Sequence, residues 1–79
     1  MRRVFVPVEV QCRNDVPKRV RWNGRDYRVE SMAECWVVES RWWNASALSR
    51  RVYYRLYTDH GVLEVFRSDG RWILARIAD

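Results

Sequence analysis

The stretch YYRLYTDHGVLEVFRSDGRWIL, residues 53–74, places two turn signals between three runs of β-forming residues. Asp69-Gly70 favours a two-residue hairpin turn, because such turns need the positive φ angles that Gly and Asp tolerate. The triplet Asp59-His60-Gly61 predicts a three-residue loop with Gly at the position of positive φ. The stretch therefore predicts an antiparallel meander of three strands and an all-β fold.

Setting the register of these strands by their turns predicts two faces of different chemistry. The first is almost entirely apolar and is expected to face the core; it carries Val52, Tyr54, Leu56, Val62, Glu64, Phe66, Ile73, Ala75 and Ile77. The second interleaves arginine with rings and aliphatic side chains; it carries Arg51, Tyr53, Arg55, Tyr57, Leu63, Val65, Arg67, Trp72, Leu74 and Arg76.

The stretch KRVRWNGRDYRVES, residues 18–31, predicts another hairpin. Asn23-Gly24 supplies the two positive-φ residues of a type I′ turn, which sets Trp22 opposite Arg25. One face of this hairpin then contains mostly charged side chains and must be solvated. That face carries Arg19, Arg21, Asp26, Arg28 and Glu30.

The remaining segments complete a small domain. Residues 4–12 alternate with valine on one side, and Pro7 restricts this strand to a sheet edge because it lacks a donor. Residues 32–38 fit either a strand or a short helical turn, and residues 39–51 predict one long loop with a helical turn near 45–51. About six short strands predict a single domain over residues 1–79, a small antiparallel barrel or bent roll of SH3-like or OB-like type.

The composition favours an anionic partner. The 79-residue chain has a net charge of +5, and fourteen of its fifteen basic residues are arginine. The planar arginine fork binds phosphate and stacks on rings. A small, basic, aromatic-rich domain is typical of a protein that binds nucleic acid or an acidic protein surface.

The chain shows no signal peptide and no long apolar run, which predicts a cytoplasmic protein that is not inserted in a membrane. Cys12 and Cys35 are then reduced thiols and are expected to serve as small core residues. His60, the single histidine, lies at a predicted hairpin tip with no second histidine for a zinc site or catalytic triad. The sequence therefore predicts a protein that is not an enzyme and has no cofactor, metal or small-molecule substrate.

The arginine and aromatic side chains of the second face suit single-stranded nucleic acid, which stacks its bases on exposed rings while cations meet its phosphates. The candidate nucleic-acid-binding residues are Arg51, Tyr53, Arg55, Tyr57, Arg67, Trp72 and Arg76, with Arg19, Arg21 and Arg28 as a second basic surface. Two interpretations remain open. The face is either an open platform or is covered by the first hairpin, because Leu63, Val65 and Leu74 are too apolar to leave in water.

Arg41, Trp42 and Trp43 form a candidate partner-binding site in the predicted long loop. Neighbouring residues on a strand point to opposite faces, so a single flat core does not bury both tryptophans. We expect one indole to close the end of the barrel and the other to lie at its rim beside Arg41, where it suits a base or a protein partner.

The spacing of the rings over residues 17–79 resembles a small bacterial domain family of unknown function. The residues that carry the resemblance are Trp22-Asn23-Gly24-Arg25, Tyr27, Trp36, Trp42-Trp43, Tyr54, Gly61, Gly70-Arg71-Trp72 and Asp79. That family occurs as short stand-alone proteins and as the C-terminal tail of inactive Y-family DNA polymerase homologues, the mutasome subunit. The resemblance implies a setting in DNA damage tolerance and assigns no site.

Two functions follow from the sequence. The first is a non-enzymatic accessory module that binds single-stranded or damaged DNA in bacterial repair or translesion synthesis. The second is a protein-interaction module that docks on a polymerase or another repair protein through an exposed tryptophan and a sheet edge.

Overall fold

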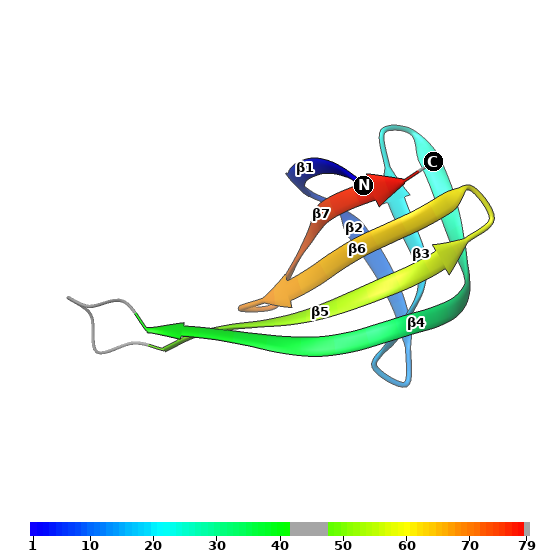
Figure 1. The fold of residues 1–79 in the computed structure, drawn as a ribbon. Helices are drawn as coiled ribbons and strands as arrows, with labels where there is room; N and C mark the ends of the chain where they lie inside the picture. Colours follow the sequence, from blue (N-terminus) through cyan, green and yellow to red (C-terminus); the bar gives the residue numbers. More distant parts are fainter. Residues whose placement is uncertain (42–47, 79) are drawn as a thin grey trace.

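The computed structural model describes residues 1–41 and 48–78 and shows an all-β fold, as predicted (Figure 1). Its strands are β1 (Arg2–Pro7), β2 (Glu9–Arg13), β3 (Val16–Trp22), β4 (Arg25–Arg41), β5 (Leu48–Thr58), β6 (Gly61–Ser68) and β7 (Arg71–Ala78). They form one antiparallel sheet in the order β1-β7-β6-β5-β4-β3-β2, which curls into a half-barrel. The described residues contain seven strands instead of about six, because residues 4–12 divide into β1 and β2 at Val8.

The curl of the sheet depends on the long strand β4. Its first residues, Arg25 to Arg28, pair with β3, whereas the stretch from Val29 to Arg41 pairs with β5. Two register shifts follow the change of partner, one between Val29 and Ser31, and shifts of this kind bend a strand. As a result, β2 and β3 cross behind the layer formed by the other strands (Figure 1).

The core lies between these two parts of the sheet. Its buried members are Val20, Tyr27, Tyr54, Leu56, Leu63, Val65, Leu74 and Ile77. The alternating valines of residues 4–10 all pack against this cluster, which agrees with their predicted position on one side of the strand. Pro7 lies on β1, an end strand of the sheet, as predicted from its missing donor.

The first hairpin has the predicted register. Trp22 pairs with Arg25, and Arg21 pairs with Asp26. Asn23 and Gly24 have φ angles of 55° and 75°, as a type I′ turn requires.

The turn between β5 and β6 differs from the prediction by one residue. Thr58 pairs with Gly61, so the loop consists of Asp59 and His60 alone. The Thr58 hydroxyl stabilises this tight turn, since it donates to the Gly61 carbonyl at 2.7 Å and accepts from the His60 N–H at 3.1 Å. A slip of one residue moves every side chain of a strand to the other face. The predicted faces of β6 are therefore exchanged, and Leu63 and Val65 lie fully buried in the core.

The pairing of β6 with β7 contains a register shift that the sequence did not predict. Leu74 pairs with Val65 but Arg76 pairs with Glu64, so Ala75 is an additional residue at a bulge. Beyond the bulge Ile77 points into the core and is 1% exposed.

These differences place Arg67 and Trp72 on the inner face of the sheet, away from Arg51 and Arg55 of β5. The Trp72 ring lies 5.5 Å from the Tyr54 ring, and the Arg67 guanidinium lies 5.5 Å from the Trp72 ring centre. Burial raises the pKa of Tyr54 above its ordinary value. The three aliphatic residues that made the predicted platform too apolar, Leu63, Val65 and Leu74, are thus core residues.

The described residues of the predicted long loop, 39–41 and 48–51, are strand and not loop. β4 and β5 stay paired out to Arg41 and Leu48, beyond the point where β6 pairing ends at Val52, and form a projecting two-stranded arm (Figure 1). The helical turn predicted near 45–51 is wrong for 48–51, and Trp42 and Trp43 lie outside the described residues.

The prediction that Cys12 and Cys35 are core residues is also wrong, because both thiols are exposed. In the part of the chain that the structure describes, no helix is long and apolar enough to span a membrane.

Candidate nucleic-acid interface

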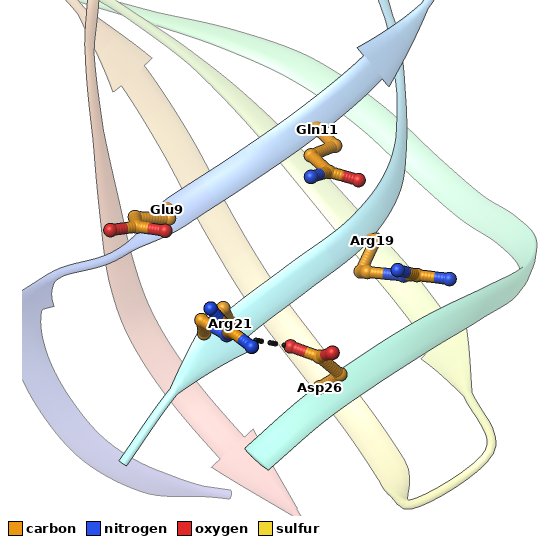
Figure 2. Close-up of a pocket in the computed structure, with 5 residues that line it drawn as sticks. All are labelled: Glu9, Gln11, Arg19, Arg21 and Asp26. Atoms are coloured by element: carbon orange, nitrogen blue, oxygen red, sulfur yellow. Dashed lines mark hydrogen bonds and ion pairs between the residues drawn. The ribbon is translucent and has the colours of Figure 1, made fainter. Parts of the chain in front are cut away.

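The predicted arginines lie mainly on two surfaces. The first, which we call the hairpin surface, is formed by the hairpin of β3 and β4 together with β2. Figure 2 shows Arg19 and Arg21 beside Glu9, Gln11 and Asp26, which line a cavity of about 100 Å³. Arg21 Nε donates to Asp26 Oδ1 at 2.9 Å. The two arginines and two carboxylates cancel in charge, so this cavity has little attraction for a polyanion. Arg28 is exposed outside this cavity, and its backbone N–H donates to Asp59 Oδ1 at 2.9 Å.

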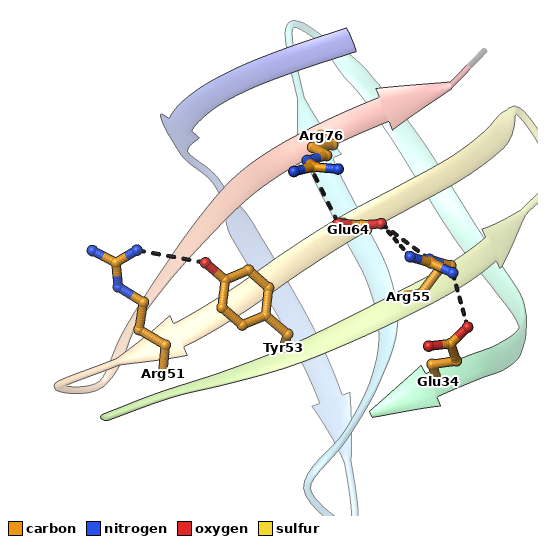
Figure 3. Close-up of polar contacts among 6 residues, drawn as sticks. All are labelled: Glu34, Arg51, Tyr53, Arg55, Glu64 and Arg76. Carbon is orange, nitrogen blue, oxygen red and sulfur yellow. Dashed lines mark hydrogen bonds and ion pairs between the residues drawn. The ribbon is translucent and has the colours of Figure 1, made fainter. Parts of the chain in front are cut away.

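The second surface is the outer face, defined as the side of strands β1, β7, β6, β5 and β4 that is turned away from β2 and β3. Arg51, Tyr53, Arg55, Glu64 and Arg76 project from it (Figure 3). Unlike the hairpin surface, it brings several rings together with the arginines.

The rings form a row across the outer face, which we call the ring row: Trp36, Tyr53, Phe66 and Phe5. Trp36 and Tyr53 are stacked with ring centres 5.2 Å apart and planes 8° apart. Tyr53 lies 4.9 Å from Phe66, and Phe66 lies 5.5 Å from Phe5. Aromatic contacts at such separations are favourable beyond the area they bury.

The ladder register explains most of the row. Trp36 of β4 lies directly opposite Tyr53 of β5, and Tyr53 lies opposite Phe66 of β6. Side chains in such positions are neighbours on one face of an antiparallel sheet. Phe5 comes from β1, two strands from β6. The intervening strand β7 contributes Ala75 to the same groove, and this small side chain leaves room for the Phe5 ring to reach Phe66.

Phe5 adopts an unfavourable backbone conformation to reach this position. Its φ angle is 58°, at the register shift in β1 between Arg3 and Val6. A bulky residue with positive φ costs on the order of 1–3 kcal/mol, which glycine avoids. The ring is nevertheless 43% exposed, so burial repays little of this cost. Strain of this kind concentrates at functional sites, which makes Phe5 a candidate for contact with a ligand.

Three guanidinium groups lie over the ring row. Arg51 lies 4.8 Å from the Phe66 ring centre and 5.7 Å from that of Phe5. Arg3 lies 5.3 Å from Phe5, and Arg55 lies 5.6 Å from Trp36. Cation–π contacts hold these groups in place and leave the N–H edges of Arg3 and Arg51 able to donate.

Carboxylates neutralise one side of the outer face. Arg55 donates through Nε and Nη2 to Glu64 Oε2 at 3.0 and 2.8 Å, and through Nη1 to Glu34 Oε1 at 2.8 Å (Figure 3). The hydrogen bond to Glu64 is the main reason that the pKa of Arg55 is raised. Glu64 is 4% exposed, and its second oxygen lies 4.0 Å from Arg76 Nε.

Arg3 and Arg51 have a different environment. Within residues 1–41 and 48–78, the ion pairs include neither guanidinium. Arg51 Nη1 lies 3.5 Å from the Tyr53 hydroxyl, a neutral partner. The two groups flank Phe5 and line a groove of about 340 Å³ with Trp36 and Tyr53. Pockets of this order hold small ligands, so the groove has room for a group of nucleoside size.

The structure brings five of the seven predicted sheet residues together on the outer face: Arg51, Tyr53, Arg55, Tyr57 and Arg76. Arg67 and Trp72 do not belong to it, because the shorter turn moves them to the inner face. The outer face also contains four residues that were not predicted from the sequence: Arg3, Phe5, Trp36 and Phe66. Phe5 had a usable signal, since it alternates with the core-facing valines of its strand and must therefore point outward.

Of the predicted partner-binding residues, Arg41 ends β4 and pairs with Leu48, whereas Trp42 and Trp43 lie outside the described residues. His60 is exposed at its turn, 3.9 Å from Asp59 Oδ2. No group of three His, Cys, Asp or Glu side chains within residues 1–41 and 48–78 is arranged to hold a metal ion.

Comparison of the chain with family models, curated proteins and solved structures finds no match.

Proposed function

We propose that this protein is a non-enzymatic accessory module that binds single-stranded nucleic acid across its outer face. The observation that supports the proposal most strongly is the ring row flanked by Arg3 and Arg51, two guanidinium groups outside the ion pairs of the described residues. Stacking surfaces beside unneutralised cations are the two elements that unpaired strands require.

The roles of the rings follow from their exposure. Phe5 and Tyr57 are 43% and 49% exposed and offer surfaces for bases, while Trp36 and Tyr53 are half-buried and present ring edges and part of a face. Phe66 is buried and supports its neighbours. Base stacking contributes about 1–3 kcal/mol per ring in comparable platforms. Arg3 and Arg51 bind the phosphates on either side of Phe5, and Arg55 is held over Trp36 by its two carboxylates.

The proposed setting is bacterial DNA repair or translesion synthesis in the cytoplasm, with damaged or single-stranded DNA as the ligand. It depends on the resemblance of the Trp and Tyr spacing to the domain found in mutasome subunits. A DNA polymerase or another repair protein is the expected neighbour in that setting.

Fluorescence anisotropy with labelled oligonucleotides tests the proposal. We expect binding to a single strand at about 50 mM salt, and an affinity that falls with salt at a log–log slope near −0.7 for each phosphate contacted. A duplex of the same sequence should bind more weakly, because its bases are not free to stack. Absence of binding to the single strand at low salt would overturn the proposal.

A second candidate function is docking on a repair protein through a sheet edge. The observation that favours it is the edge of β4, where Val37 and Val38 are 45% and 41% exposed. A contact led by apolar burial and backbone hydrogen bonds should respond little to salt, whereas phosphate contacts respond steeply. The salt dependence of binding therefore separates the two functions.

Removing a carboxylate from the outer face should strengthen nucleic-acid binding. Glu34→Gln takes away one negative charge beside Arg55 and leaves that guanidinium less neutralised, so we expect affinity to rise about threefold to tenfold at low salt. Glu9→Gln is the matched control, since it makes the same change in net charge on the hairpin surface. Equal gains from the two substitutions would show that overall charge, and not the outer face, controls binding.

A further inference from the structure

One edge of the sheet is long and has no strand beside it. β4 pairs with β3 only as far as Arg28, and from Val29 to Arg41 it pairs on its other side with β5. From Glu34 to Arg41, a segment that we call the free stretch of β4, its register is continuous. Within residues 1–41 and 48–78, no strand pairs with the free side of this stretch. Its outward N–H and C=O groups are therefore available for a further strand.

The other free edges carry features that prevent pairing. β1 has six residues, a register shift at Phe5 and a proline at its end. β2 has five residues and a register shift after Gln11. Short strands, bulges and proline are the means by which proteins protect their edges.

The free stretch of β4 lacks these features. It contains neither proline nor lysine, and Val37 and Val38 are exposed on it. Its first acid, Glu34, is bound to Arg55 of β5 at 2.8 Å, so that carboxylate is held toward the sheet and away from the free edge. An exposed and regular edge whose central residues, Trp36 to Val38, are apolar is a pairing surface.

We propose that a second copy of this chain pairs with the edge, antiparallel, about a two-fold axis at Val37. This register places the two Val37 residues opposite each other and Trp36 of each copy opposite Val38 of the other. Cross-strand pairs between aromatic and β-branched residues are favourable. Glu34 faces Ser40 and Cys35 faces Glu39, so no two like charges meet. A register centred on Glu34 would instead place two carboxylates opposite each other.

The pairing has a consequence for the outer face. The Trp36 residues of the two copies would occupy diagonal positions roughly 7–8 Å apart. Because Trp36 ends the ring row, two ring rows would join into one continuous surface. The dimer itself does not depend on the proposed nucleic-acid binding, and its test contains no nucleic acid.

Sedimentation equilibrium of the full chain measures the association. We expect the average mass to rise above the monomer value of 9.6 kDa with concentration, toward twice that value. Val37→Lys should lower the association constant at least about tenfold, because two ammonium groups would lie opposite each other. Met32→Lys is the matched control, an exposed residue of the same strand outside the paired stretch, and should leave association unchanged. A wild-type chain that stays monomeric at high micromolar concentration would overturn the proposal and leave the edge to a strand of another protein.

Cross-linking tests the register and does not depend on the folding of the lysine variant. In a Cys12→Ser, Cys35→Ser background, Val37→Cys places two thiols opposite each other, within the separation that a disulfide spans. With oxidised glutathione as the oxidant, the two thiols lose two protons and two electrons to form the disulfide, and glutathione is reduced. We expect a covalent dimer to form at least about tenfold faster than with Met32→Cys, whose thiols face other positions. Equal rates for the two variants would contradict this register.

Discussion

Leu63→Ala is expected to lower the free energy of unfolding by about 3 kcal/mol, within the range of about 2–5 kcal/mol for a buried leucine. The side chain is fully buried among the core residues of β5, β6 and β7. A chain of this length has a total stability of roughly 4–12 kcal/mol, so the variant should lose about a quarter to three quarters of it. Urea denaturation followed by tryptophan fluorescence measures the change.

Val62→Ala is the comparison that makes this result specific to the register. Val62 is half-buried on the outer face, next to Leu63 in the chain. We expect a loss below about 1 kcal/mol, because surface substitutions remove little buried area. The three-residue turn predicted from the sequence would reverse the two results, with Val62 in the core and Leu63 outside. A larger loss for Val62→Ala than for Leu63→Ala would therefore contradict the structure.

Phe5→Gly is expected to separate binding from stability. Glycine removes the strain at φ 58° but loses the contact with Phe66 and gains chain entropy in the unfolded state. These effects offset each other, so the free energy of unfolding should change by less than about 1 kcal/mol. Affinity for single-stranded DNA should fall about fivefold to a hundredfold, the equivalent of one lost stacking contact. Urea denaturation and fluorescence anisotropy on the same preparation measure both quantities.

Phe5→Tyr is the control for the ring. Tyrosine keeps the aromatic surface and the backbone strain, so both stability and affinity should stay near the wild-type values. If glycine and tyrosine gave the same affinity, Phe5 would have no part in binding. If glycine greatly destabilised the domain, the ring would be a structural element and the strain at Phe5 would not indicate a binding site.

The sequence predicted the fold class and the first hairpin because their signals are local. Asn23-Gly24 supports few turn types, and the resulting register of Trp22 and Arg25 follows from chain geometry alone. The alternating valines of β1 and β2 likewise needed only the two-residue period of a strand. Five predicted residues do share the outer face. Four of them lie at alternate positions of β5, so the two-residue period of a strand was enough to group them.

The remainder of the site depended on features that local patterns do not determine. Asp59-His60-Gly61 permits a loop of two or three residues, and the Thr58 hydroxyl favours the shorter one through contacts made only when the turn has closed. The bulge at Ala75 and the positive φ of Phe5 are determined by packing between strands distant in sequence. Each of these features moves side chains between faces, and together they bring Glu64 and Phe66 to the outer face and remove Arg67 and Trp72 from it.

The salt dependence of binding for Arg51→Ala and Arg67→Ala tests most directly whether the outer face binds nucleic acid. Both arginines are half-buried and stack on a ring, Arg51 over Phe66 on the outer face and Arg67 over Trp72 on the inner face. We expect Arg51→Ala to weaken binding to single-stranded DNA and to reduce the log–log salt slope by about 0.7, the value for one lost phosphate contact. Arg67→Ala should leave the slope unchanged. Equal slopes for the two variants, or a larger effect of Arg67→Ala, would contradict binding at the outer face.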